Sequence, residues 1–172
     1  MKVGVIGSGV VGQTLAAGFL KHGHEVEIGT REPAKLKEWS GKHPGVKVKT
    51  FAEAAAFGEV VVLAVAGQVA LEALKLVGPK ALHGKTVIDA CNPIGGGPPV
   101  NGVLSYFTTL TDSLMERLQK AYPEAAVANF LISCYHPLMR IANDTRSAWA
   151  YRPSAFVQIS ISFTDNSATY FF

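Results

Sequence analysis

Hydrophobic positions in the first ninety residues fall alternately into short apolar runs and into helical spacing. The run at residues 59–65 has no polar alternation, which is typical of a central parallel strand covered on both faces. Thr50 and Glu53 have the spacing of a capping box and are expected to begin a helix. We therefore expect strands at residues 1–6, 24–28, 46–49, 59–65 and 86–89, and helices at residues 13–22, 33–39, 51–57 and 68–77. Strands separated by helices predict an α/β fold with a doubly wound parallel sheet.

A G-x-G-x-x-G motif joins the first expected strand to the first helix, and its residues are Gly7, Ser8, Gly9, Val10, Val11 and Gly12. In such a motif the first glycine permits a tight turn, the second admits a pyrophosphate, and the third lets the helix lie close to the sheet. The free N–H groups at the start of the helix then meet the phosphates. An isolated motif of this kind is often only a turn that needs positive φ. The flanking strand and helix instead favour a Rossmann-type dinucleotide site.

The end of the second strand indicates which dinucleotide binds. An NAD enzyme normally has Asp or Glu there, which accepts hydrogen bonds from the 2′-hydroxyl of the adenine ribose. This chain has Thr30 and Arg31 there, with Lys35 about one helical turn further on. A hydroxyl, a guanidinium and an ammonium suit a 2′-phosphate. A solvated basic turn would have the same composition, but its position relative to the glycine motif favours NADP(H) over NAD(H).

Two other strand ends are expected beside the cofactor. Residues 64–67 are small and leave space where the cofactor should pass. Asn92 precedes Pro93, which holds it extended, so its amide is placed to reach the nicotinamide or the substrate. An Asn-Pro pair that simply forms a turn is equally compatible with the local sequence. The Gly-Gly-Gly-Pro-Pro run at residues 95–99 is either a lid or a linker.

Composition narrows the class of protein. The chain has 172 residues, 48% of them hydrophobic, which is enough for one domain with a real core. Its net charge of +3 comes from dispersed side chains, so no nucleic-acid partner is expected. The sequence shows neither a leader pattern nor an apolar run of membrane-spanning length, so a cytoplasmic protein without a membrane partner is expected. Cys91 and Cys134 suggest neither a metal site nor a disulfide framework.

Several separated motifs resemble the F420-dependent NADP oxidoreductase family. They are G-V-I-G-S-G-V-V-G-Q-T-L-A at residues 4–16, G-H-E-V at 23–26, G-T-R at 29–31 and A-C-N-P at 90–93. The resemblance continues through residues 113–119 and 122–125 to about Val127. It implies an enzyme that moves a hydride between the nicotinamide of NADP(H) and the deazaflavin ring of coenzyme F420. It also implies a small-molecule coenzyme as substrate and a homodimer.

The resemblance also assigns roles to residues. It implies that Ser8, Gly9, Val10 and Val11 hold the pyrophosphate, that Thr30, Arg31 and Lys35 bind the 2′-phosphate, and that Val65, Ala66, Asn92 and Pro93 lie near the rings. Both coenzymes carry their own reactive carbon, so the protein has to orient the rings and exclude water. We therefore name no catalytic residue. Asp89 is a weak candidate, because an Asp that ends a buried strand more often accepts neighbouring backbone N–H groups.

The chain beyond Val127 departs from the family. All 17 glycines lie at or before Gly102, the last lysine is Lys120, and the last glutamate is Glu124. We therefore expect a Rossmann domain at residues 1–127 and an atypical C-terminal segment at 128–172. That segment is either divergent or out of frame, or it is a differently built cap that completes the sheet, with a strand at 129–135 and an edge hairpin at 154–163. Neither alternative gives functional weight to His136, Cys134 or Arg140.

Two classes of function remain open from the sequence. One is an oxidoreductase that passes a hydride between NADP(H) and F420 or a related flavin-like acceptor. The other is a non-catalytic NADP(H)-binding module that lacks a working acceptor site. The residues that would distinguish them lie in the unmatched C-terminal segment.

Overall fold

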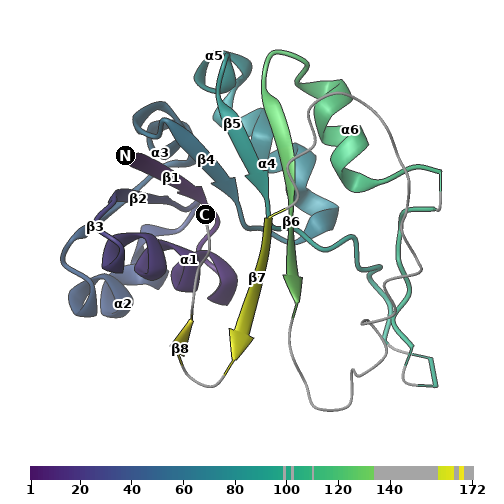
Figure 1. Cartoon of the computed structure of the whole chain (residues 1–172), viewed down its shortest axis with the longest axis horizontal. Helices are drawn as coiled ribbons and strands as arrows, with labels where there is room; N and C mark the ends of the chain where they lie inside the picture. Colours follow the sequence, from purple (N-terminus) through teal and green to yellow (C-terminus); the bar gives the residue numbers. More distant parts are fainter. Residues whose placement is uncertain (99, 102, 110, 134–158, 165–166, 169–172) are drawn as a thin grey trace.

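The fold is a mainly parallel sheet with helices on both faces (Figure 1). The computed structural model describes residues 1–133 except 99, 102 and 110, together with residues 159–164 and 167–168. Six strands run parallel in the order β3-β2-β1-β4-β5-β6, which confirms the predicted Rossmann-type doubly wound sheet. They are β1 (Lys2–Ile6), β2 (Glu25–Gly29), β3 (Val46–Lys49), β4 (Val60–Leu63), β5 (Thr86–Asp89) and β6 (Ala126–Ser133).

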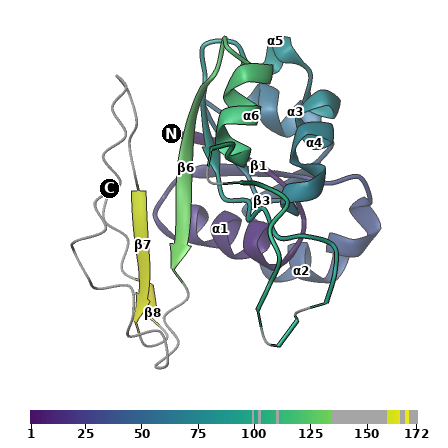
Figure 2. The ribbon, with the colours of Figure 1, turned by 90° about the vertical axis from the view of Figure 1, so that its right-hand side faces the viewer.

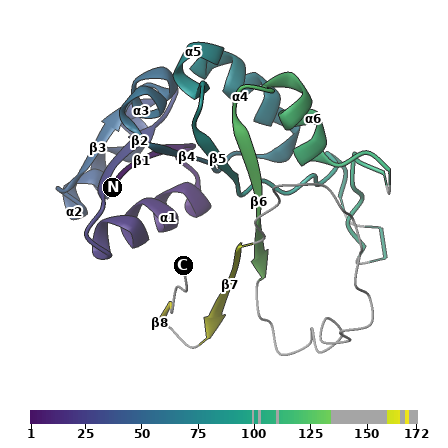
Figure 3. The same cartoon turned by 45° about the horizontal axis from the view of Figure 1, so that its top comes forward.

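The helices cover both faces of this sheet. They are α1 (Val10–Lys21), α2 (Lys37–Lys42), α3 (Phe51–Phe57), α4 (Ala70–Val77), α5 (Pro79–Leu82) and α6 (Leu114–Ala121). Figure 3 shows α3, α4, α5 and α6 on one face and α1 on the other. The predicted capping box is confirmed, because the Thr50 side chain accepts from the Glu53 backbone N–H and the Glu53 carboxylate accepts from the Thr50 backbone N–H.

Two apolar clusters lie on the opposite faces of the sheet. On one face Val3, Val5 and Val62 pack with Leu15 and Ala16 of α1. On the other face Ile6, Val61 and Leu63 belong to a cluster with residues of α3, α4 and α6. Because successive side chains of a strand point to opposite faces, a strand covered on both faces is apolar at every position. This explains the unbroken apolar run of β4.

The helix expected at residues 33–39 differs from the structure. Its first turn is a 3₁₀ helix, η1 (Pro33–Leu36), and the α-helix α2 then continues to Lys42, three residues beyond the expected end. The Lys35 backbone N–H donates to the Glu32 carbonyl, 3.1 Å away, which is the spacing of a 3₁₀ turn. The helix expected at 68–77 likewise begins with a 3₁₀ turn, η2 (Gly67–Val69), before α4.

The sheet continues beyond residue 127, where the atypical segment was expected to begin. The parallel pairing of β6 passes from β5 to β7 (Ile159–Thr164), which lies beside it in Figure 2. A two-residue strand, β8 (Ser167–Ala168), pairs antiparallel with β7. Residues 159–162 therefore pair in parallel with β6, and Phe163 and Thr164 pair antiparallel with β8. Cys134, His136, Arg140 and residues 154–158 lie outside the described residues.

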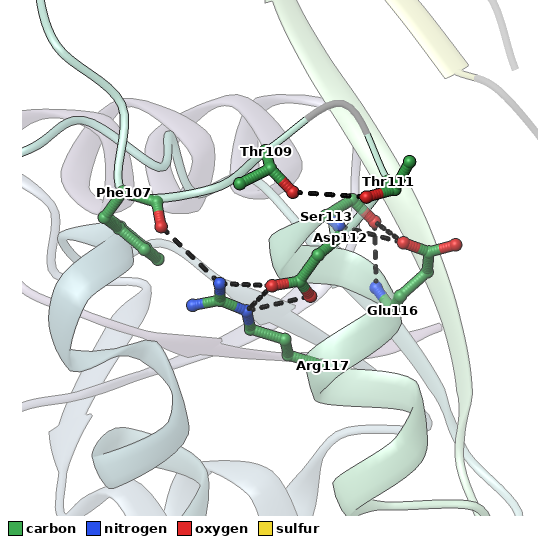
Figure 4. Close-up of polar contacts among 7 residues, drawn as sticks. All are labelled: Phe107, Thr109, Thr111, Asp112, Ser113, Glu116 and Arg117. Carbon is green, nitrogen blue, oxygen red and sulfur yellow. Dashed lines mark hydrogen bonds and ion pairs between the residues drawn. The ribbon is translucent and has the colours of Figure 1, made fainter.

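A long segment connects β5 to α6 and extends away from the sheet in Figure 1. Isolated bridges pair Ile94 with Tyr106 and Val100 with Val103. Figure 4 shows how its end is tied to α6. The Arg117 guanidinium donates to the Asp112 carboxylate and, over 3.5 Å, to the Phe107 carbonyl. This clamp holds the connecting segment against the start of α6.

Candidate dinucleotide site

The turn between β1 and α1 requires two of its three motif glycines for reasons internal to the chain. Gly7 has φ +126°, and a Cβ there would lie 2.1 Å from the Ala64 carbonyl oxygen. A Cβ at Gly12 would lie 2.1 Å from the Gly7 carbonyl oxygen, so α1 packs directly on the turn. A Cβ at Gly9 would meet nothing within 4 Å. Open space at Gly9 is what a bound pyrophosphate needs.

The start of α1 lies in this open space and has no anionic partner of its own. Gly9 is the N-cap, no side chain caps the helix, and its first turn contains no acidic residue. A helix start without a cap presents backbone N–H groups and the positive end of the helix dipole to an anion. The Gln13 side-chain amide donates to the Ser8 carbonyl over 2.8 Å, which stabilises the turn.

A pocket of about 450 Å³ extends from this turn to the end of β2. Gly7, Ser8 and Gly9 line one part of it, and Thr30, Arg31 and Lys35 line another. The buried Thr30 hydroxyl donates to the Ser8 hydroxyl over 3.0 Å, which ties the end of β2 to the glycine turn. Ser8 and Gly9, two of the four residues expected to hold the pyrophosphate, thus share one continuous pocket with the residues expected to bind the 2′-phosphate.

Glu32, which was not among the predicted site residues, lines the same pocket. Its backbone N–H donates to the Thr30 hydroxyl over 3.1 Å, and its carboxylate lies 2.9 Å from the Lys35 ammonium. The hydrogen bond and charge of Lys35 lower the pKa of Glu32, and the charge of Arg31 lowers it further. The available signal was the three-residue spacing from Glu32 to Lys35, which favours an ion pair on one face of a helical turn.

A second pocket of about 490 Å³ adjoins the first and shares Gly9, Ala64, Val65 and Ala66 with it. Val10, Val11 and Asn92 also line it. The ends of β4 and β5 meet there, because a Cβ at Gly67 would lie 2.2 Å from the Asn92 carbonyl oxygen. Gln68, which was not among the predicted site residues, also lines this pocket. Its side-chain amide donates to the Ile94 carbonyl over 3.0 Å.

All of the predicted site residues except Gly12 and Pro93 line one of these two pockets. Gly12 is buried under the turn. Pro93 lines a separate pocket of about 250 Å³, together with Asp89, Cys91 and Ser113. Adjacent residues Asn92 and Pro93 therefore face different spaces.

Comparison with known proteins agrees with this arrangement. The family described as NADP oxidoreductase, coenzyme F420-dependent, matches residues 2–93, more than half of the chain. The chain belongs to this family. No curated protein matches the chain.

Solved structures extend the comparison. A candidate F420-dependent NADP reductase from Arthrobacter sp. FB24 is 40% identical, with a TM-score of 0.68 over 74% of this chain and 60% of that one. A hypothetical protein from Sinorhizobium meliloti is 25% identical, with a TM-score of 0.61 over 74% of this chain and 59% of that one. An Aspergillus terreus imine reductase, at 22% identity, has a TM-score of 0.54 over 74% of this chain and 39% of that one, and it shares the fold. This family member therefore spans about 60% of the length of the Arthrobacter protein.

Asp89 has the structural role that its position suggested. It is fully buried at the end of β5, and its Oδ1 accepts from the Cys91 backbone N–H over 3.0 Å. Its Oδ2 has no hydrogen-bond partner among the described residues. Burial raises the pKa of Asp89, although the Cys91 N–H acts in the opposite direction. Burial also raises the pKa of the Cys91 thiol, which therefore stays protonated and is a poor nucleophile.

The described part of the chain contains no cluster of His, Cys, Asp and Glu that could hold a metal ion. Among its helices, none has the length and apolar character needed to cross a membrane.

Proposed function

We propose that the protein is an NADP(H)-dependent oxidoreductase that exchanges a hydride with coenzyme F420. The observation that carries the proposal is the continuity of the pocket from the uncapped start of α1 to Thr30, Arg31 and Lys35. Membership of the family supports it independently. The second pocket, which shares its lining with the first, supplies adjoining space for the nicotinamide.

Each part of the site has a separate binding task in this proposal. The N–H groups at the start of α1 bind the pyrophosphate, which occupies the space above Gly9. Arg31 and Lys35 bind the 2′-phosphate, and the Thr30 hydroxyl holds this part of the site against Ser8. Val65, Ala66 and Asn92 border the nicotinamide. Pro93 contributes by restricting the backbone of Asn92, since it lines a different pocket itself.

The chemistry asks little of the side chains. Nicotinamide and deazaflavin, when bound, supply both reactive carbons between which the hydride moves. Ala64, Val65 and Ala66 line the junction of the two pockets with apolar side chains, against which the rings can pack. Asn92 offers an amide donor and acceptor that fix ring orientation. We assign no general acid or base among the described residues, because Asp89 is buried and bonded to backbone.

Mixing the protein with NADPH and oxidised F420 and following the deazaflavin absorbance tests this proposal. Loss of the absorbance at a rate proportional to protein concentration is the expected result. The same assay with a flavin in place of F420 tests whether the acceptor is specifically the deazaflavin. No loss of absorbance with either acceptor, despite bound NADPH, contradicts the oxidoreductase proposal.

A non-catalytic NADP(H)-binding module is the second candidate. One observation favours it: the family match covers residues 2–93, which hold the dinucleotide motif, and does not extend into the segment that follows. NADPH binding without turnover selects this candidate. Sedimentation of the protein with NADPH tests the homodimer that the sequence resemblance implies, and a monodisperse dimer is the expected result for the enzyme.

A further inference from the structure

The pocket wall at the end of β2 contains opposite charges where the 2′-phosphate is proposed to bind. Arg31 and Lys35 each carry a positive charge, and Glu32 carries a negative charge between them in sequence. Lys35 and Arg31 hold the pKa of Glu32 low, so its carboxylate is ionised at neutral pH. This part of the wall therefore has a net charge of about one positive unit rather than two.

Glu32 is held at the pocket by one backbone contact and one side-chain contact. Its backbone N–H donates to the Thr30 hydroxyl over 3.1 Å, and that hydroxyl donates to Ser8. Its side chain is 2.9 Å from the Lys35 ammonium. Because Thr30 is buried, the backbone of Glu32 is anchored to the floor of the site. Glu32 and Lys35 thus both line the pocket beside Thr30, with their paired side chains open to solvent.

The two forms of the adenine ribose make opposite demands on this pair. A 2′-hydroxyl is a hydrogen-bond donor and suits a carboxylate, whereas a 2′-phosphate carries up to two negative charges and is repelled by it. A phosphate also competes with Glu32 for the Lys35 ammonium. Glu32 consequently repels the 2′-phosphate that Arg31 and Lys35 attract.

We propose that Glu32 sets the nucleotide preference of this site: its carboxylate accepts from the ribose 2′-hydroxyl of NAD(H) and holds Lys35 there, but must release Lys35 when NADP(H) binds. The site then accepts both dinucleotides, with a preference for NADP(H) that Glu32 reduces. This inference rests on the nucleotide binding in the proposed function but not on the F420 acceptor.

The test is to measure NADPH and NADH dissociation constants for the wild type and for Glu32→Gln by fluorescence titration. Glutamine keeps the shape and a neutral acceptor, and removes the charge. NADPH should bind about fivefold more tightly, the effect of one unit charge about 4 Å away in water. NADH should bind about threefold more weakly, because a neutral acceptor replaces a charged one. The steepness of the NADPH salt dependence should also increase.

The matched control is Glu38→Gln. Glu38 forms an exposed ion pair with Lys42 at 3.2 Å and does not line the pocket, so the variant makes the same change in net charge elsewhere. It should leave both dissociation constants unchanged. Glu32→Gln combined with Lys35→Ala should lose most of the NADPH gain, because the freed ammonium is then absent.

The results separate this inference from the proposed function. Unchanged or weaker NADPH binding in Glu32→Gln, with wild-type binding intact, overturns the role of Glu32 and leaves the NADP(H) site standing. An equal gain in Glu38→Gln overturns it as well, because the effect is then one of net charge. A wild type that binds neither dinucleotide overturns both proposals. F420 turnover is measured separately and affects only the proposed function.

Discussion

The starts of α1 and α6 make opposite use of the same backbone groups. At α6, Ser113 accepts from the Glu116 backbone N–H, and the Glu116 carboxylate accepts from the Ser113 backbone N–H, as Figure 4 shows. At α1, Gly9 leaves the helix without a side-chain cap, and no acid lies in its first turn. A helix start satisfied by its own residues contributes stability, whereas an unsatisfied one is available to a ligand. The contrast supports the proposed anion site at the start of α1.

The pockets beside the two helices extend this contrast. The pocket at the start of α6 is lined by Asp89, which is buried, and by Ser113, which is exposed. Asp112, also near this helix start, is neutralised by Arg117, which lowers the pKa of Asp112. The pocket at the start of α1 contains the basic residues Arg31 and Lys35 as well as Glu32 and Glu72. The uncapped helix start beside two basic residues supports the proposed phosphate site at α1, whereas the start of α6 is already capped by its own residues.

The largest expected effect comes from filling the space at the start of α1. Gly9→Val should abolish binding of NADPH and NADH, because the side chain takes the place of the pyrophosphate. Gly9→Asp should also lower the affinity, by on the order of 100-fold or more, and raise stability by a few tenths of a kcal/mol by capping α1. Titration and thermal unfolding measure the two effects.

Gly41→Asp is the control for these variants, since a side chain at Gly41 also meets open space but lies outside both pockets. It should leave the affinity unchanged. Retained NADPH affinity in Gly9→Val would show that the pyrophosphate does not lie at α1.

Removing the Arg31 guanidinium should produce the next largest effect. Arg31→Ala is expected to weaken NADPH binding by about 1.5–3 kcal/mol, the range for a charged hydrogen bond, and to leave NADH binding nearly unchanged. Lys42→Ala removes the same charge at a site outside the pocket and serves as control. Equal losses for the two nucleotides in a titration of Arg31→Ala would mean that Arg31 does not contact the 2′-phosphate.

Removing the cap of α6 should affect stability but not binding. Ser113→Ala is expected to lower the free energy of unfolding by about 1 kcal/mol, while the dissociation constant of NADPH stays the same. Denaturant unfolding and titration measure these two quantities. Ser113→Thr keeps a hydroxyl and should retain most of the stability. A large loss of NADPH affinity in Ser113→Ala would break the distinction between the two helix starts.

The smallest expected effect is a change in pH dependence at Asp89. Burial raises its pKa in the folded protein, so the folded chain binds this proton more tightly than the unfolded chain. The stability from the protonated carboxyl is fully present below the unfolded pKa of about 3.9 and is lost as pH rises through the folded pKa. Asp89→Asn removes this titration, so its stability relative to wild type should rise from pH 4 to pH 7 in denaturant titrations. A difference that is constant with pH contradicts this.

Local patterns in the sequence were enough for much of the fold. The Thr50–Glu53 spacing predicted the capping box of α3, and the unbroken apolar run predicted β4 as a strand covered on both faces. The glycine motif predicted the turn from β1 to α1, although α1 starts at Val10, three residues earlier than expected. These features depend on backbone conformation and on side-chain periodicity within a few adjacent residues, so contiguous sequence is sufficient to specify them.

Other features depend on residues that are distant in the chain and were decided by the tertiary structure. The hydrogen bond from Thr30 to Ser8 spans 22 positions, and the one from Gln68 to Ile94 spans 26. The parallel pairing of β6 with β7 likewise required the arrangement of the sheet.

The sequence by itself determined that a strand, a glycine turn and a helix form a dinucleotide-type motif with basic residues after the second strand. Only the tertiary structure decided that Glu32 lies in that pocket, and that Asn92 and Pro93 face different spaces. The physical reason is that local conformation is set by neighbouring residues. The composition of a pocket is set by strand ends that meet only when the sheet has assembled.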